Sequence, residues 1–177
     1  MEKSKRGKIL RASQIFFSDF VLIAFLAFFA EICYNGKMTE SQKSALLSKA
    51  HEMLQFSYAP YSSFKVGAAL LCKNGKIFGG CNIENAAFSP SNCAERTAFF
   101  NAVSSSEREF EAIAIVGGAN GIVKDFCPPC GVCRQVMMEF CDAKSFKIIL
   151  QDGSGMTKEF SLEEILPLGF GAKNLQD

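Results

Sequence analysis

The chain has 177 residues, of which 49% are hydrophobic and 21% are charged, and its formal net charge is +1. This length and composition predict a globular protein with a sizeable core and exclude a disordered chain. Residues 1–37 hold six Lys or Arg against three acids, which leaves 13 basic and 15 acidic residues, a net charge of −2, in residues 38–177. A slightly acidic body fits poorly with a protein that grips nucleic acid phosphates and fits better with one that binds a small ligand.

Residues 1–37 differ in character from the rest of the chain. A basic start leads into an uninterrupted apolar run of 11 residues, shorter than the roughly 20 that a membrane-spanning helix needs. A signal or membrane anchor over residues 15–33 is one interpretation, although a small-residue cleavage pattern is missing. An additional core helix is another. We favour a mobile or non-native extension, because the sequence from Met38 begins like an independent N-terminus, with Thr39 or Ser41 available as a helix cap.

Eight cysteines are a high number for this length. An even number would suit the disulfide framework of a secreted protein. Cys72, however, lies in an apolar run typical of a strand, and Cys141 ends a predicted helix, and buried free thiols are common in both places. We therefore favour a reduced, cytoplasmic protein. Attachment to a membrane, or export, through residues 1–37 is the alternative localisation.

After the N-terminal segment, apolar periodicity and turn residues predict alternating helices and strands. The first helix ends before Pro60, and the Asn74-Gly75 pair predicts a tight turn between two strands. Ser161 and Glu164 have the spacing of a capping box, which predicts a helix start. In chain order, the expected elements are a helix over 39–55, a strand hairpin over 65–85, a helix over 92–103, a strand over 110–118, a helix over 129–141, a strand over 146–151, and a strand followed by a helix over 156–167.

This order of elements predicts an α/β domain, a three-layer α-β-α sandwich with one mixed five-stranded sheet. Two cysteine-containing motifs, "CAERTA" (93–98) and "PCGVCRQV" (129–136), fall at the starts of helices that follow strands. Helix starts of this kind cluster along one edge of such a sheet. We therefore expect the two motifs to face each other.

The second motif carries a pair of thiols with metal-ligand spacing. Cys130 and Cys133 are three residues apart at a helix start, so both side chains can point to one side of the helix. A helix N-terminus lowers thiol pKa values and favours the thiolates that bind a metal. A redox dithiol is the alternative. Cys127 and Cys130 have the same spacing, but two prolines make that stretch stiff, so we favour Cys130 and Cys133 as ligands.

Cys93 brings the number of candidate thiolates to three, the number of protein ligands in a catalytic zinc site whose fourth position holds water. A structural zinc site normally has four protein ligands. His51, the only histidine of the chain, is expected on the face of the first helix and not at a metal. Cys81, across the hairpin, is the best candidate for a fourth thiol, and with it the site would be structural.

Glu95 lies two residues after Cys93, where its carboxylate can hydrogen-bond a metal-bound water and move its proton. A carboxylate in the first turn would also complement the helix dipole, but next to three zinc-competent thiols we favour the catalytic role. Arg96 can donate hydrogen bonds to the sulfur ligands and offset the negative charge of three thiolates on Zn²⁺. A surface arginine is the alternative interpretation of Arg96.

The two motifs, together with "YAPYSSFKVGAALL" and "GCNIENAA", closely resemble those of the small cytidine deaminases of pyrimidine salvage. The resemblance covers residues 38–177 and implies a catalytic domain over that range. It implies hydrolytic deamination of cytidine and deoxycytidine to uridine and deoxyuridine, with one Zn²⁺ per subunit held by Cys93, Cys130 and Cys133. Glu95 would take a proton from the zinc-bound water and pass it to ring nitrogen 3 and then to the departing ammonia.

The resemblance also implies a set of substrate-binding residues. Asn82 and Glu84 would bind the ribose hydroxyls, Phe64 would line the base pocket, and Ala94 would contact the substrate. Phe170 would reach the site of a neighbouring subunit, which implies a homotetramer with composite active sites. From the residues alone, Asn82 is a turn residue at a strand end and Phe64 is a core residue.

Two features depart from the family pattern. Phe88 stands where many relatives have a tyrosine, so a hydroxyl contact is lost there, and residues 1–37 have no counterpart.

Other functions stay open. The same fold could deaminate a different nucleoside, such as a nucleoside antibiotic. Editing of a polynucleotide is disfavoured by the acidic body. In a non-catalytic zinc-stabilised interaction module, Cys81 would complete the ligand set and Glu95 would be dispensable.

Overall fold

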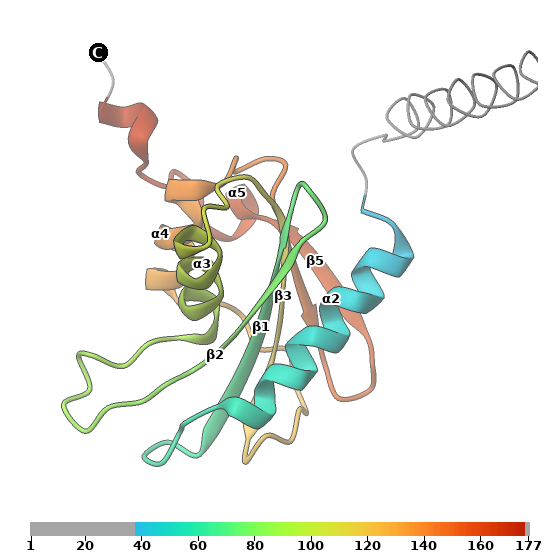
Figure 1. The fold of residues 1–177 in the computed structure, drawn as a ribbon, viewed down its shortest axis with the longest axis vertical. Helices are drawn as coiled ribbons and strands as arrows, with labels where there is room; N and C mark the ends of the chain where they lie inside the picture. Colours follow the sequence, from blue (N-terminus) through green and yellow to red (C-terminus); the bar gives the residue numbers. More distant parts are fainter. Residues whose placement is uncertain (1–37, 176–177) are drawn as a thin grey trace, which may run out of the picture. The chain divides into compact units, whose positions relative to one another are not determined.

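A computed structural model describes residues 38–175, and every structural statement below concerns that part of the chain. The predictions for residues 1–37 lie outside the described residues. Figure 1 shows the elements in chain order. They are α2 (Glu40–Met53), η1 (Leu54–Phe56), β1 (Phe64–Cys72), β2 (Ile77–Cys81), α3 (Ala94–Ser104), β3 (Phe110–Ala119), α4 (Gly131–Phe140), β4 (Lys147–Gln151), β5 (Thr157–Ser161), α5 (Leu162–Ile165) and η2 (Ala172–Leu175).

Five strands form one mixed sheet in the order β2-β1-β3-β4-β5. β1 pairs antiparallel with β2 and β3, β4 pairs antiparallel with β5, and β3 and β4 are parallel. The central strand β3 is buried along almost its whole length, as a continuous apolar run predicts. The predicted Asn74-Gly75 turn joins β1 to β2, with Gly75 at a φ of 86°. The predicted capping box of Ser161 and Glu164 is also present and starts α5.

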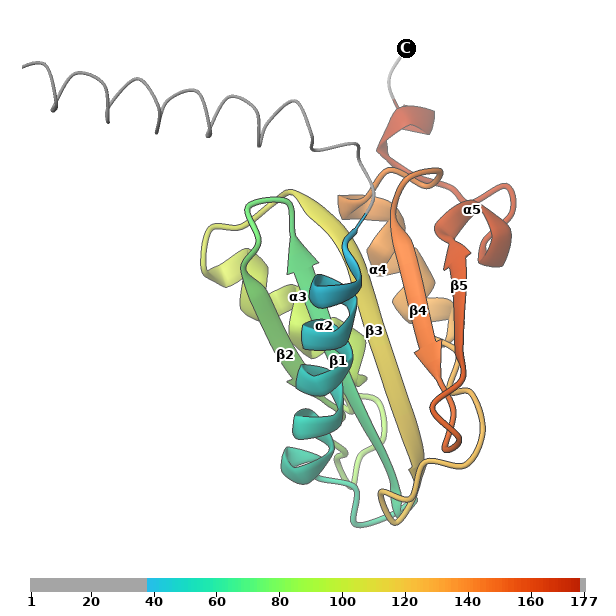
Figure 2. The same cartoon turned by 90° about the vertical axis from the view of Figure 1, so that its right-hand side faces the viewer.

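Helices cover both faces of this sheet. α2 lies on one face, and α3 and α4 lie on the other, as Figure 2 shows. The three-layer α-β-α sandwich around a mixed five-stranded sheet is therefore confirmed. The differences from prediction are at element boundaries. α3 begins at Ala94 and not at Asn92, because Asn92 forms a β-bridge with Ile83. The first helix begins at Glu40, so that Ser41 lies inside it.

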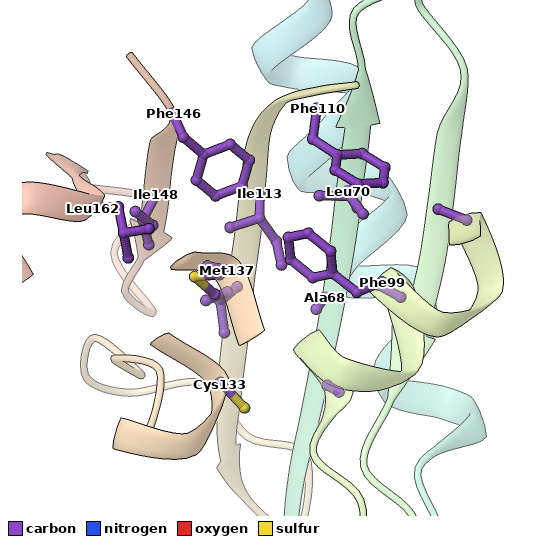
Figure 3. Packing of buried hydrophobic residues seen from close by; sticks show 14 of the residues in the cluster. Ala68, Leu70, Phe99, Phe110, Ile113, Cys133, Met137, Phe146, Ile148 and Leu162 are labelled. Atoms are coloured by element: carbon purple, nitrogen blue, oxygen red, sulfur yellow. The ribbon is translucent and has the colours of Figure 1, made fainter. Parts of the chain in front are cut away.

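The hydrophobic core that carries the cysteine motifs lies between the sheet and the helices α3 and α4. The ring centroid of Phe99 is 5.1 Å from that of Phe110 and 5.9 Å from that of Phe140. The ring centroid of Phe146 is 6.1 Å from that of Phe99, and Figure 3 shows Cys133 of α4 at the edge of the same cluster. Close packing of this kind fixes the two helices relative to each other.

The seven cysteines of the described part are free thiols. No helix within residues 38–175 is long and apolar enough to cross a membrane.

Candidate active site

Each of the two cysteine motifs places a cysteine at the N-cap of a helix. Cys93 is the N-cap residue of α3 and Cys130 is the N-cap residue of α4, and both have an extended backbone. Neither side chain makes a capping hydrogen bond. The two thiols are therefore available for other contacts at the point where the two helices begin.

Cys93, Cys130 and Cys133 form a cluster of three sulfur atoms. Their Sγ atoms all lie within 4.8 Å of one another. The Sγ atoms of Cys93 and Cys130 are 3.8 Å apart, and those of Cys130 and Cys133 are 3.5 Å apart. Zn–S bonds of about 2.3 Å in a tetrahedral site would hold two sulfurs about 3.8 Å apart. The cluster therefore fits a zinc ion, with one coordination position left for a non-protein ligand.

The other thiols and the histidine of the described part do not join this cluster. The Cys81 thiol is buried and donates to the carbonyl oxygen of Phe56 at 3.3 Å. His51 Nε2 lies 2.8 Å from Oε1 of Gln151. Cys127 is close to the cluster but is not one of its members. This arrangement argues against a four-ligand structural site completed by Cys81.

Arg96 contacts the cluster through its guanidinium group. Its Nη2 donates to Sγ of Cys93 at 3.6 Å and to the carbonyl oxygen of Ser91 at 3.1 Å. A hydrogen bond from Cys133, together with the contact to Arg96, lowers the pKa of the Cys93 thiol to about 5. The hydrogen bond to Cys93 and burial raise the pKa of the Cys133 thiol. The positive charge of the Arg96 guanidinium offsets part of the negative charge of the Cys93 thiolate. Three thiolates can therefore lie close together at this site.

Glu95 is the buried charged residue of the described part, with 5% of its surface exposed. It lines the same cavity as Cys93 and Cys130. Burial raises the pKa of the Glu95 carboxyl to about 7. A carboxylate that only complemented the helix dipole could stay in water, and burying it costs free energy. The burial of Glu95 beside the sulfur cluster is therefore typical of a functional group.

A cavity of about 360 Å³ opens over these groups, within the range of roughly 300–1,000 Å³ that small-molecule sites occupy. The cavity brings together the predicted sugar-side residues, the predicted base-side residues and the cluster. Its lining consists of Ser62, Phe64, Val66, Asn82, Glu84, Ser91, Asn92, Cys93, Ala94, Glu95, Arg96, Cys127, Pro128 and Cys130.

Two residues named from the sequence do not line this cavity. Cys133 is 1% exposed and belongs to both the cluster and the core. Phe170 is 57% exposed near the C-terminus, and its carbonyl oxygen accepts a hydrogen bond from Nε2 of Gln135 at 2.8 Å. Within one chain, Phe170 is thus separate from the cavity that the other predicted residues share.

Residues 40–149 match the family described as "Cytidine and deoxycytidylate deaminase zinc-binding region". The chain belongs to this deaminase family. The cytidine deaminase of Sporosarcina psychrophila is 45% identical over 130 residues, which are 73% of this chain and 92% of that protein. The cytidine deaminase of Halalkalibacterium halodurans is 44% identical over 135 residues, 76% of this chain and 98% of that protein.

A solved structure agrees with both relatives. The crystal structure of cytidine deaminase from Burkholderia pseudomallei has a TM-score of 0.67 and 43% sequence identity, and the match covers 75% of this chain and 100% of that one. The chain is therefore an enzyme of the cytidine deaminase type. Its cofactor is zinc, and the three-cysteine cluster fits one ion per subunit.

Several residues of the deaminase cavity were not predicted from the sequence, among them Ser62 and Ser91. Ser62 belongs to "YAPYSSF", which the sequence identifies only as a loop. Its position two residues before Phe64, the predicted base-pocket residue, is the one signal that could have drawn attention to its hydroxyl group. Cys127, which the sequence does not favour as a zinc ligand, also lines the cavity.

Phe88, the departure from the family pattern, lies at the mouth of the deaminase site. It is 74% exposed and has a φ of 55°, which is unusual for a residue other than glycine. Its ring makes an edge contact with that of Tyr61, with centroids 6.2 Å apart. Both rings line a second cavity that shares Ser62 and Glu84 with the first. An apolar rim formed by these two rings thus adjoins the Glu84 side of the site.

Proposed function

We propose that this chain catalyses the hydrolytic deamination of cytidine and 2′-deoxycytidine to uridine and 2′-deoxyuridine, in cytoplasmic pyrimidine salvage. The supporting observation is the position of the buried Glu95 beside the three-thiol cluster, in a cavity that Asn82 and Glu84 also line. Each turnover consumes one water and releases one ammonia. The names of the relatives at 45% and 44% identity agree with this reaction.

Cys93, Cys130 and Cys133 would hold the zinc ion. Zinc, when bound, is a Lewis acid that lowers the pKa of a water at an open position to about 7. Arg96, through its contact with Sγ of Cys93, withdraws negative charge from the ligand set. The three thiolates and the guanidinium together give a site that is nearly neutral when the ion is present.

Glu95 moves the protons. It accepts one proton from the water that attacks carbon 4 of the pyrimidine and gives it to ring nitrogen 3. It then carries the second proton of that water to the amino group, the C4–N bond breaks, and ammonia leaves as a carbonyl forms at carbon 4. The burial of Glu95 keeps bulk water away from the carboxylate during both transfers.

The sugar and base are held at the other end of the cavity. Glu84 offers carboxylate oxygens to the ribose hydroxyls, and Asn82 offers an amide. Nδ2 of Asn82 donates to the carbonyl oxygen of Phe64 at 2.8 Å, so one of its two hydrogens stays available. Phe64 presents its ring to the base, and Ala94 lies against the substrate next to Cys93.

Phe170 belongs to a composite site in a homotetramer. An aromatic side chain that is 57% exposed and lies outside its own chain's cavity is free to reach a neighbour. Light scattering coupled to size exclusion should give four chains of 19.4 kDa. Phe170→Ala should keep its zinc and lower kcat/KM, and full activity in a monomer would contradict the composite site.

The catalytic domain spans residues 38–177 and does not need residues 1–37. A protein beginning at Met38 should fold, bind zinc and deaminate cytidine as well as the full chain does. Failure of this shorter protein to fold would contradict the proposed boundary. Sedimentation of the full chain with membranes, through residues 15–33, would replace the cytoplasmic localisation with a tethered one.

The decisive experiment is a metal and activity assay on the full chain. Zinc per chain is measured by emission spectroscopy, and conversion of cytidine and 2′-deoxycytidine is followed by ultraviolet absorbance and by released ammonia. We expect one zinc per chain and a conversion that a chelator abolishes and added zinc restores. Zinc at one per chain without conversion of either nucleoside would overturn the proposal in favour of another substrate.

A further inference from the structure

The carboxylate of Glu84 is engaged by three donors from one short loop. The backbone N–H groups of Tyr61 and Ser62 donate to Oε2 at 3.0 and 3.2 Å. The Ser62 hydroxyl donates to Oε1 of the same carboxylate. A half-buried side chain that could otherwise sample several rotamers is therefore held in one orientation.

The direction of the Ser62 hydroxyl is itself fixed. The backbone N–H of Phe64 donates to Oγ of Ser62 at 3.0 Å, so this oxygen accepts on one side and directs its hydrogen to Glu84 on the other. Ser63, between them, has a φ of 56°, and its carbonyl oxygen accepts from the backbone N–H of Asn120 at 2.6 Å. This left-handed turn, tied to the end of β3, places Ser62 against the carboxylate.

The contacts leave one acceptor position on Glu84. A carboxylate has about four lone-pair positions. Tyr61 and Ser62 fill two on Oε2, and the Ser62 hydroxyl fills one on Oε1. The position that remains is on Oε1, the oxygen that Ser62 also binds. The Ser62 hydroxyl therefore controls where the free position points.

We propose that Ser62 is a positioning residue that aims the free acceptor position of Glu84 at the ribose hydroxyls and so sets the affinity for the sugar. The proposal rests on the proposed function, in which Glu84 binds ribose. The same hydroxyl ties the carboxylate to the backbone of Phe64, which lines the cavity too. Sugar and base recognition are thus joined by one short chain of hydrogen bonds.

The electrostatics agree with the geometry. The hydrogen bond from the Ser62 hydroxyl, with help from the two backbone N–H groups, lowers the pKa of the Glu84 carboxyl. Glu84 is therefore ionised near neutral pH, and a charged acceptor forms stronger hydrogen bonds with hydroxyl groups than a neutral one does.

The test compares two nucleosides in the Ser62→Ala variant of the full-length zinc enzyme. For cytidine we expect KM to rise about tenfold, the usual effect of losing one hydrogen bond to a charged group, with kcat within about twofold. For 2′,3′-dideoxycytidine, which lacks both hydroxyls, KM should not change. Its inhibition constant against cytidine replaces KM if its turnover is too slow to follow.

Two further variants separate positioning from general damage. Ser62→Thr keeps the hydroxyl and should restore most of the affinity for cytidine. Ser154 donates its hydroxyl to Oδ1 of Asp152 at 2.7 Å in the β4–β5 turn, a contact of the same chemistry away from the cavity. Ser154→Ala should leave both nucleosides unaffected. Ser62→Ala in a Glu84→Gln background should add no further loss.

An equal rise in KM for both nucleosides would overturn the proposal, because it would show that Ser62 only braces the loop. An unchanged KM for cytidine would overturn it as well. If Glu84→Gln alone does not affect cytidine more than dideoxycytidine, then Glu84 is not the ribose ligand, and the sugar assignment fails together with the role of Ser62. If the wild-type enzyme converts neither nucleoside, the proposed function fails first.

Discussion

Gly80 of β2 and Ala94 of α3 approach so closely that no side chain fits between them. A β-carbon on Gly80 would lie 2.3 Å from the Ala94 carbonyl oxygen and 2.4 Å from the backbone nitrogen of Ala98. Ala94 directly follows the Cys93 thiol and precedes the Glu95 carboxylate. The absence of a side chain at Gly80 therefore sets the position of both reactive groups relative to the sheet.

Gly80→Ala should destabilise the protein by about 1–3 kcal/mol, because the added carbon meets backbone atoms that cannot move independently. Urea denaturation measures this loss. Gly171→Ala is the control, since a β-carbon there meets atoms no closer than 3.4 Å, and it should change stability by less than about 0.5 kcal/mol. Equal stability of the two variants would show that α3 can shift away from the sheet.

Glu95→Gln should abolish deamination while leaving zinc and fold in place. The amide keeps the size of the side chain but cannot carry a proton, so kcat should fall by at least about 10²–10⁴-fold. The measurements are kcat, zinc per chain and thermal melting. Glu163→Gln, on the exposed first turn of α5, should change none of them. Retained activity in Glu95→Gln would show that Glu95 is not the group that carries the protons.

Cys130→Ala should reduce bound zinc from one per chain to near zero, because two thiols do not complete a stable tetrahedral site. Cys81→Ala is the matched control. It removes a buried thiol whose hydrogen bond goes to Phe56 and not to the cluster, so zinc should stay at one per chain, at a cost of about 1 kcal/mol in stability. Loss of zinc in Cys81→Ala would make Cys81 a fourth ligand.

Arg96→Gln should lower zinc affinity or activity by about 10–100-fold, the usual effect of losing a group that supports metal ligands. The physical reason is the loss of the guanidinium contact to Sγ of Cys93 at 3.6 Å. Competition with a chromogenic chelator measures the affinity. Arg108→Gln is the control, because the Arg108 guanidinium donates to the backbone carbonyl oxygens of Val103 and Glu107 and not to the cluster. An unchanged zinc affinity in Arg96→Gln would show that Arg96 does not support the metal ligands.

Glu107 predicts a pH dependence of stability. Its carboxylate accepts from Lys76 at 2.7 Å and from Asn74 at 2.9 Å, and the hydrogen bond from Lys76 lowers its pKa below the ordinary value of 4.5. The contribution of the ionised Glu107 carboxylate to the free energy of unfolding is therefore complete above pH 4.5. It is lost as the pH falls through the folded-state pKa of Glu107. The stability difference between wild type and Glu107→Gln should narrow on acidification. Parallel curves would mean that the contacts contribute nothing.

Much of the fold and the sulfur cluster could be predicted from the sequence, because these depend on local patterns. The continuous apolar run of β3 requires a strand buried on both faces, and the two cysteine motifs require helix starts. Local patterns could not show whether Cys81 is a fourth zinc ligand. Its distance from the cluster depends on which face of β2 carries the thiol, and the structure shows the thiol directed to Phe56.

The sugar end of the site was harder to predict for a physical reason. The contact between Ser62 and Glu84 joins residues 22 positions apart and depends on a left-handed backbone at Ser63. Serine has no strong preference for that conformation, so the sequence gives no local signal for the turn. The tie between Asn120 and Ser63 forms only when β1 and β3 are already paired.

The direction of α3 determines where the chain can accept insertions. Its 11 residues lead away from the cavity over about 16 Å. The segment over residues 105–109 and the β1–β2 turn therefore meet at the opposite end of the sheet, where the backbone N–H of Lys73 donates to the carbonyl oxygen of Glu109 at 3.0 Å. Those two connections can acquire insertions, a fluorescent tag or a surface anchor without reaching the chemistry, so this end is the natural place to graft new modules.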